Sequence, residues 1–248
     1  MNLFIVLATG RNGHHAIINW LCTQHGDITH YNDLDAPYFN SRKLRVKRPP
    51  IVYGNGTHTM ASLERFPVLK WQTLKQENSK YFEHVDNVQY ILVIRRFRNW
   101  LASVMLQGNP PRCKTHNRLI KRPNAAHWIK TPGRYHQLLT AAINAEQHPE
   151  LLVIRFDDWF TDKNYRQNIC EYLHIPFTDA GLNKVAYFGN GSSFDEQTYD
   201  GKAQEMKVLE RWKTGLEVKE YAETLEVYSI LDELSEQYFT KPARVPCP

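Results

Sequence analysis

The chain begins with an apolar run that meets a glycine-rich turn, and this junction constrains the fold more than any other stretch. Every residue from Leu3 to Ala8 is apolar, which is typical of a central parallel strand covered on both faces. Gly10 and Gly13 interrupt the run. Apolar residues then recur at helical spacing, at Ala16, Ile17, Trp20 and Leu21. We therefore expect a buried strand, a tight turn and a helix that begins near His14.

The turn between this strand and this helix is suited to binding an anion. The first amide groups of a helix have no partner within the helix, and the helix dipole is positive at that end. The phosphate loop of nucleoside triphosphatases needs Gly-x-x-x-x-Gly-Lys-Ser/Thr, but Gly13 is followed by His14, His15 and Ala16. Because the lysine and the hydroxyl are missing, a kinase that uses magnesium–ATP is disfavoured. A plain βα turn without a ligand is the alternative for this stretch alone.

The composition excludes several classes of protein. The 248 residues are 42% hydrophobic, which suits one α/β domain over residues 1–248. No basic leader and no span of about 20 apolar residues is present, so we expect a cytoplasmic chain without a membrane partner. The four cysteines lack Cys-x-x-Cys spacing, so neither a disulfide framework nor a metal is expected. A net charge of +5 suits an anionic cofactor or acceptor better than nucleic acid.

Two segments lack periodicity and carry many cations. Residues 40–65 include five cations between Arg42 and Arg48, and we interpret them as a long surface loop. This basic run is either a solvated face or the surface that meets an acidic acceptor. Residues 109–124 are rich in proline and cations, which favours a mobile lid.

The strand from Val88 to Ile94 gives the strongest signal, because cations follow it at once. The next helix has an apolar face made by Trp100, Leu101, Val104 and Met105. Arg95 ends the strand, and Ser103 lies about two turns inside the helix. Arginines at such a strand end are suited to binding an anion. The alternative is that these arginines pair with surface carboxylates.

The remaining apolar runs complete a sheet of about five strands. Further strands are expected at residues 27–31, 66–71 and 151–156, with helices at 72–83, after Gly133 and from about 218 to 238. Asp157 and Asp158 follow the last strand and are expected to cap the next helix or to brace a nucleotide loop. The fold class is therefore α/β, with a mostly parallel sheet flanked by helices.

In this order, these segments resemble the sulfotransferases that use 3′-phosphoadenosine 5′-phosphosulfate (PAPS), whose fold is P-loop-like. The resemblance implies that the first loop binds the 5′-phosphosulfate, through Arg11, Asn12, Gly13, His14, His15 and Ala16. It implies that Arg95 and Ser103 bind the 3′-phosphate. A late loop closes over the nucleotide in this family, and Ser-Ser-Phe followed by Arg211-Trp212-Lys213 resembles bacterial members, so Lys202 or Arg211 is expected to contribute.

The same resemblance implies a sulfuryl transfer to a hydroxyl or amine of a glycan or small molecule, with Arg11 and Lys70 in catalytic roles. Lys70-Trp71-Gln72 resembles the Lys-Thr-His segment of the family at its first position only, and Gln72 cannot accept a proton. We rank Asp33 first as the catalytic base, because polar residues after the second strand lie where open α/β sheets bind ligands. Further candidates are His30, Asp35, His58 and His14. The alternative functions are a nucleotide or small-molecule kinase and a non-catalytic nucleotide- or polyanion-binding protein.

Overall fold

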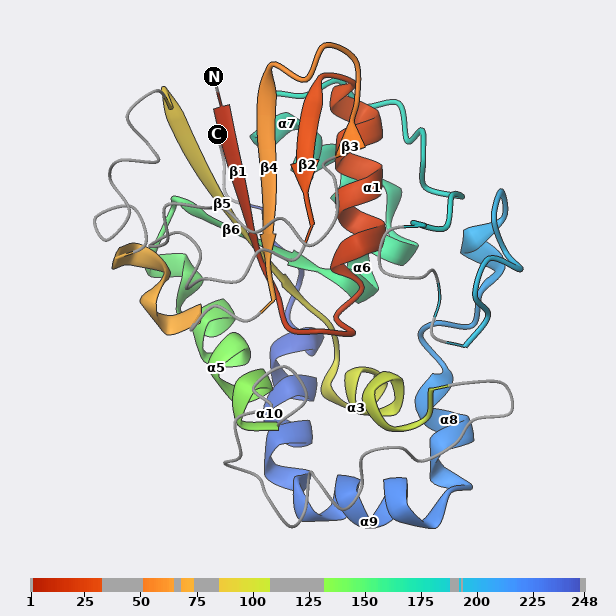
Figure 1. Cartoon of the computed structure of the whole chain (residues 1–248). Helices are drawn as coiled ribbons and strands as arrows, with labels where there is room; N and C mark the ends of the chain where they lie inside the picture. The colour runs from red at the N-terminus through yellow and green to blue at the C-terminus, as the bar shows by residue number, and fades with distance from the viewer. Residues whose placement is uncertain are drawn as a thin grey trace, which may run out of the picture.

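A six-stranded sheet forms the centre of the molecule (Figure 1). The computed structural model describes residues 2–32, 51–64, 68–73, 85–107, 132–187, 192 and 194–245. The strands are β1 (Asn2–Leu7), β2 (Ile28–Tyr31), β3 (Ile51–Val52), β4 (His58–Leu63), β5 (Asn87–Ile94) and β6 (Leu151–Arg155). Their spatial order is β3-β2-β4-β1-β5-β6. Only β3 pairs antiparallel, with β2. The expected α/β fold with a mostly parallel sheet is confirmed, with six strands rather than about five.

Helices cover both faces of this sheet. They are α1 (His14–His25), α3 (Phe97–Met105), α5 (Pro132–Ile143), α6 (Phe156–Thr161), α7 (Lys163–Tyr172), α8 (Arg211–Leu216), α9 (Lys219–Val227) and α10 (Ser229–Thr240). Short 3₁₀ helices lie at Val68–Thr73 (η2), Asn144–Gln147 (η5) and Ala203–Glu205 (η6). In Figure 1, β1 runs down from the N-terminus, and α3, α8 and α9 lie below the sheet.

The first strand shows why both faces need a cover. Its side chains alternate between two hydrophobic clusters, because successive residues of a strand point to opposite faces. Leu3, Ile5 and Leu7 join the cluster that includes α3, α5 and α10. Phe4, Val6 and Ala8 join the cluster that includes α1, α6 and α7. A strand buried on both sides reads as a continuous apolar run, as the sequence of β1 indicates.

The interpretation of residues 40–65 as one irregular loop is wrong for its described part. Residues 51–64 contribute β3 and β4, and β4 lies between β2 and β1, in register from Leu3 beside Thr59 to Leu7 beside Leu63. The polar start of β4 hides its strand character. Pairing with two neighbours overrides the weak local propensity of this segment.

The strand expected at residues 66–71 is also wrong, because Val68–Thr73 forms the 3₁₀ helix η2. Val68 and Trp71 are buried here, whereas Leu69 and Lys70 are exposed. A spacing of three between buried residues fits the three-residue turn of a 3₁₀ helix and not the period of two of a strand.

Two helical expectations change in detail. The helix predicted from about 218 to 238 is two helices, α9 and α10, which meet at Tyr228. The helix expected after Gly133 is α5, which begins at Pro132, where proline is tolerated because the first amide has no helical partner. The lid expected at residues 109–124 lies outside the described residues, as does most of the helix expected at 72–83.

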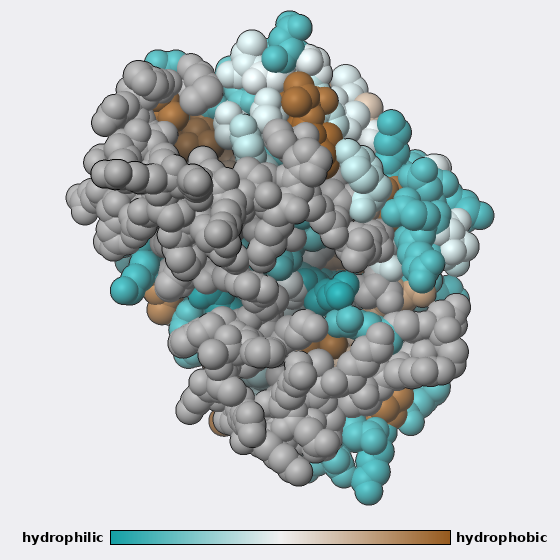
Figure 2. All heavy atoms as spheres, viewed as in Figure 1, coloured by the Kyte–Doolittle hydropathy of each residue, from teal (hydrophilic) through white to brown (hydrophobic). Residues whose placement is uncertain are grey.

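On the surface, large exposed hydrophobic side chains include Val52, Tyr187, Val227 and Ile230. On the face seen in Figure 2, the coloured hydrophobic residues form small separate patches among hydrophilic ones. Within the described ranges, we find no helix with the length and apolar character needed to cross a membrane.

Candidate functional site

The turn after β1 has the backbone conformation of an anion-binding loop. Arg11 and Gly13 both have positive φ angles, 75° and 83°, a region that glycine adopts easily and other residues rarely. Gly13 is the N-cap of α1, and no side chain caps the helix there. The first turn of α1 also contains no acidic residue. The positive end of this helix is therefore turned toward the loop without a carboxylate of its own first turn to neutralise it.

Two aromatic side chains fix this loop against the rest of the sheet. The Trp100 indole, on α3, donates a 3.0 Å hydrogen bond to the Gly10 carbonyl. Phe156, the first residue of α6, packs so closely that a Cβ atom at Gly13 would lie 2.3 Å from its ring. Within the loop, the Asn12 amide donates to the Thr9 hydroxyl at 2.7 Å. The loop is therefore held by side chains from α3 and α6, the helices that follow β5 and β6.

Arg95 and Ser103 lie together, as the family resemblance implies. The Arg95 guanidinium donates a 3.0 Å hydrogen bond to the Ser103 hydroxyl, and the two residues are 2% and 1% exposed. The guanidinium also donates to the backbone carbonyl of Val208. Its Nε has no hydrogen-bond partner within the described part of the chain. A buried donor without a partner is costly, so Arg95 retains capacity for one more acceptor.

Three guanidinium groups gather around this loop. Burial, together with the nearby charge of Arg211, lowers the pKa of Arg95 to about 9. Burial likewise lowers the pKa of Arg211 to about 10, with Arg11 contributing as a nearby like charge. The pKa of Arg11 is also lowered by burial. Burial is the largest cause of all three shifts, because desolvation disfavours the charged form of a guanidinium. Arg11, Arg95 and Arg211 therefore form a guanidinium cluster that favours a multiply charged anion.

Arg211 reaches the cluster from the late part of the chain. Its guanidinium donates to the Ser192 hydroxyl at 2.8 Å and pairs with Asp195 at 3.2 Å. It also lies over the Phe194 ring, 4.3 Å from the centroid. Of the two late cations expected from the sequence, Arg211 is the one that joins the cluster. Lys202 is exposed, and its ammonium lies over the Tyr199 ring.

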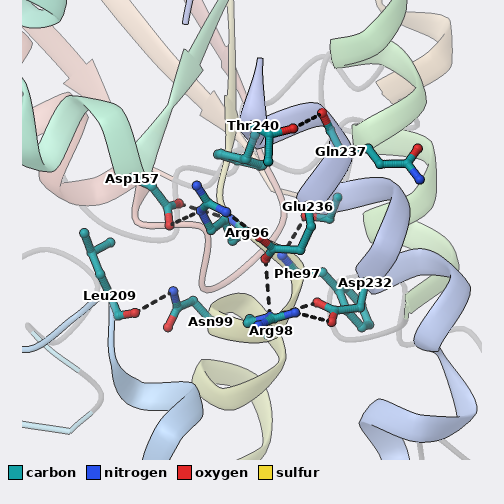
Figure 3. Close-up of polar contacts among 12 residues, drawn as sticks. Arg96, Phe97, Arg98, Asn99, Asp157, Leu209, Asp232, Glu236, Gln237 and Thr240 are labelled. Atoms are coloured by element: carbon teal, nitrogen blue, oxygen red, sulfur yellow. Dashed lines mark hydrogen bonds and ion pairs between the residues drawn. The ribbon is translucent and has the colours of Figure 1, made fainter. Parts of the chain in front are cut away.

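A network of ion pairs braces the turn that carries Arg95 (Figure 3). Asp157 accepts the Arg96 amide N–H at 3.1 Å, and Arg96 pairs with Glu236 of α10. Arg98 pairs with Asp232 at 2.7 Å. Asp157 thus braces the loop after β5, as one of the two roles expected for it. Asp162, and not Asp157 or Asp158, caps α7, by accepting two backbone N–H groups.

Glu64 was not expected from the sequence. It follows β4 at the edge of the sheet where β1 and β5 also end. Its carboxylate lies 3.3 Å from the His14 Nε2, and its charge raises the pKa of Arg11 against the effect of burial. Arg11 itself donates to the Gln107 amide oxygen at 3.0 Å. Glu64 was missed because β4 was not recognised, so nothing placed its end beside the first loop.

Other expected site residues lie elsewhere. Lys70 is exposed on η2, where the neighbouring Trp71 packs on Tyr90 and on His148 just before β6. His58 starts β4 and therefore lies at the opposite edge from Glu64.

Of the residues expected to include the base, His30 is the next-to-last residue of β2 and is 0% exposed. Asp33 and Asp35 lie outside the described residues. The structure therefore places one candidate near the carboxyl end of a strand but in the core.

Comparison with known proteins gives matches at the level of structure. No protein-family model matches the chain, and no curated protein matches its sequence. The crystal structure of mouse sulfotransferase SULT7A1 complexed with PAP matches with a TM-score of 0.52 and 11% identity, over 95% of this chain and 88% of that one. The sulfotransferase domain from the curacin biosynthetic pathway has a TM-score of 0.46 and 12% identity, over 92% of this chain and 97% of that one. The first match extends over nearly the whole of both proteins, and from it we conclude that this chain has the sulfotransferase fold.

Proposed function

We propose that this chain is a sulfotransferase that transfers a sulfuryl group from PAPS to a hydroxyl or amine of a glycan or small-molecule acceptor. The guanidinium cluster carries this proposal. Arg11, Arg95 and Arg211 are drawn from three distant segments, and each has its pKa lowered by burial. A ligand with several negative charges would offset both the repulsion between the guanidinium groups and the free-energy cost of burying their charges. PAPS offers two such groups, the 5′-phosphosulfate and the 3′-phosphate.

The residues around Arg95 fit a 3′-phosphate. The orphaned Nε of Arg95 and the hydroxyl of Ser103 are donors on opposite sides of a rigid turn. The Val208 carbonyl accepts from the same guanidinium, and a phosphate oxygen is a stronger acceptor because it is charged. A bound 3′-phosphate would therefore replace this carbonyl. The nucleotide of the SULT7A1 complex, PAP, has the same 3′-phosphate.

The residues of the first loop fit the 5′ end of the donor. The amides of residues 13–15 lie at the start of α1, where a helix terminus attracts phosphate. The amides of Asn12 and Ala16 donate within the loop, to the carbonyls of Thr9 and Gly13. Arg11 lies in the same turn. It is close enough to Arg211 for its positive charge to lower the pKa of Arg211. PAPS supplies the sulfuryl group, and the role that we assign to Arg11 is to stabilise the negative charge that develops during transfer. His14 and His15 replace the usual hydroxyl residues, so backbone groups carry most of this binding.

The acceptor and the base are proposed on sequence grounds. A base within hydrogen-bond reach must take the acceptor's proton, and Asp33 remains our first candidate, ahead of the buried His30. The five cations between Arg42 and Arg48 favour an acceptor that is itself acidic. The catalytic role of Lys70, which is exposed on η2, is proposed on the same sequence grounds.

The binding test compares two nucleotides that differ in the 3′-phosphate. We expect calorimetry to show that adenosine 3′,5′-bisphosphate binds much more tightly than AMP. A hydrogen bond to a charged group contributes about 1.5–3 kcal/mol, which is about 10- to 150-fold in affinity. Arg95→Ala should abolish the difference. Arg134→Ala is the matched control, because Arg134 is another buried arginine, with a pKa of about 10, on α5. Equal affinities of the wild type for both nucleotides would refute the assignment.

The activity test uses labelled PAPS with a panel of glycans, phenols, alcohols and peptides. Transfer of label to any class identifies the acceptor. Tight binding of the bisphosphate without transfer to any acceptor would instead favour the non-catalytic nucleotide-binding protein. These two measurements separate the donor site from the chemistry.

A further inference from the structure

Two imidazoles and a carboxylate meet at the first turn of α1. The His14 Nε2 lies 3.3 Å from a Glu64 carboxylate oxygen. One ligand atom from each of His14, His15 and Glu64 lies within 4.8 Å of the other two. His14 is 1% exposed, whereas His15 and Glu64 are partly exposed. The group is therefore anchored in the core on one side and open to solvent on the other.

One distance within this group is close to the separation of two ligands of a transition metal. Zinc binds imidazole nitrogens and carboxylate oxygens at about 2.0–2.2 Å, and two ligands at the tetrahedral angle are then about 3.4 Å apart. The separation of 3.3 Å between His14 and Glu64 is close to this value. The His15 ligand atom lies within 4.8 Å of the other two. Rotation of this partly exposed side chain to another rotamer would bring its nitrogen to the distance of a third metal ligand. Two histidines and one carboxylate are the protein ligands of open, three-ligand zinc sites.

We propose that His14, His15 and Glu64 bind a divalent transition-metal ion of the Zn²⁺ class, with a fourth position open toward the first loop. The widely spaced cysteines gave no sign of such a site. The ligands instead come from α1 and from the residue after β4, which the sheet places side by side. This inference does not rest on the proposed function, because the three side chains are sufficient ligands without a nucleotide.

The charges around the site determine when the metal binds well. Glu64 offsets one positive charge, but Arg11 and the helix terminus lie close by and oppose a cation. An anion that supplies an oxygen to the fourth position removes this opposition. We therefore expect the affinity for the metal to increase when inorganic sulfate is present. The metal and the anion would then bind cooperatively at the first loop.

Cobalt(II) is the probe, because its visible absorption reports coordination number and its ligand preferences are close to those of zinc. The full chain without nucleotide should bind one equivalent, develop the bands of four-coordinate Co²⁺ and lose them when Zn²⁺ is added. Glu64→Gln and His15→Gln should each weaken binding at least about tenfold, because loss of even an outer partner of a ligand costs 10- to 100-fold. Both positions are partly exposed, so these variants should fold.

The control is His58→Gln. His58 and His25 have ring centroids 4.7 Å apart, at the opposite edge of the sheet, and are a second pair of imidazoles that could attract metal. If His58→Gln keeps the one-equivalent site and sulfate tightens it, the proposal is supported. Absence of one-equivalent binding, wild-type affinity in Glu64→Gln, or no effect of sulfate would overturn it. A chain that binds Co²⁺ but not adenosine 3′,5′-bisphosphate would support the metal site while refuting the proposed function.

Discussion

The ring of Phe156 packs against both Gly13 and Arg95. A Cβ atom at Gly13 would come within 2.3 Å of this ring, and the Arg95 guanidinium lies over it, 4.9 Å from its centroid. Phe156 directly follows β6, so the end of that strand sets the distance between the first loop and Arg95. One side chain therefore holds both halves of the anion site in register.

Gly13→Ala should damage both stability and binding. The new methyl group would clash with Phe156, and alanine would have to adopt the φ of 83°, which costs about 1–2 kcal/mol for a residue with a side chain. We expect urea denaturation to show a free energy of unfolding at least about 1 kcal/mol lower, and calorimetry to show loss of bisphosphate binding. Gly133→Ala is the control, because a Cβ there meets nothing within 4 Å. A stable Gly13→Ala that still binds would contradict the described loop.

Arg11→Ala should reduce kcat far more than it raises the Kd for the bisphosphate. A guanidinium that stabilises charge mainly in the transition state contributes little to ground-state binding. Arg11→Lys should retain part of the activity, since it keeps a positive charge. Arg244→Ala removes an exposed arginine elsewhere and should leave both quantities unchanged. Normal turnover by Arg11→Ala, measured at saturating labelled PAPS, would show that Arg11 has no role in transfer.

Asp33→Asn should abolish turnover while leaving bisphosphate binding intact, because the amide cannot accept the acceptor's proton. His30→Gln should act differently. His30 is fully buried, so we expect this change to lower the melting temperature before it affects the chemistry. Rates at several pH values, with binding measured in parallel, distinguish the two effects. If both variants retained near-normal kcat, the base would have to be sought among other residues at this edge of the sheet.

Asp157 should make stability depend on pH in an unusual direction. Burial raises the pKa of Asp157, although Arg95 and Arg96 act against the shift. A carboxyl group with a higher pKa in the folded state contributes stability that is present below the unfolded value of about 3.9 and lost as pH rises through the folded value. The wild type should therefore lose stability relative to Asp157→Asn as pH rises above about 4. Urea denaturation of both proteins across this range measures the difference, which would be constant if Asp157 titrated normally.

Much of the fold could be predicted because its central strands are buried on both faces. Apolar runs as clear as Leu3–Ala8 and Val88–Ile94 are hard to misinterpret, and glycines or cations mark where each one ends. The Arg95–Ser103 pair was expected from the resemblance to sulfotransferases, and the structure places the two side chains together. By contrast, β4 is half polar in sequence, and its position beside β1 depends on partners distant in the chain.

Glu64 was not predicted as a site residue because the strand before it, β4, was not recognised in the sequence. Glu64 is an unremarkable carboxylate in the sequence, and only the placement of β4 beside β1 brings it to His14. Arg211 was one of two late cations expected to contact the nucleotide. The sequence could not decide between it and Lys202, because no local pattern links either residue to the first loop. Its position depends on Ser192, Asp195 and Phe194, and contacts of this kind are set by tertiary packing.

The hydrogen bond from Arg95 to the Val208 carbonyl has a kinetic consequence. If a 3′-phosphate replaces this carbonyl, as proposed above, the segment just before α8 has to release the guanidinium first. Nucleotide association then contains a unimolecular step, so its observed rate in a stopped-flow experiment should reach a plateau instead of rising linearly with concentration. After each reaction, the Val208 carbonyl would compete with the product nucleotide for Arg95. This competition would speed product release and thereby raise the turnover rate.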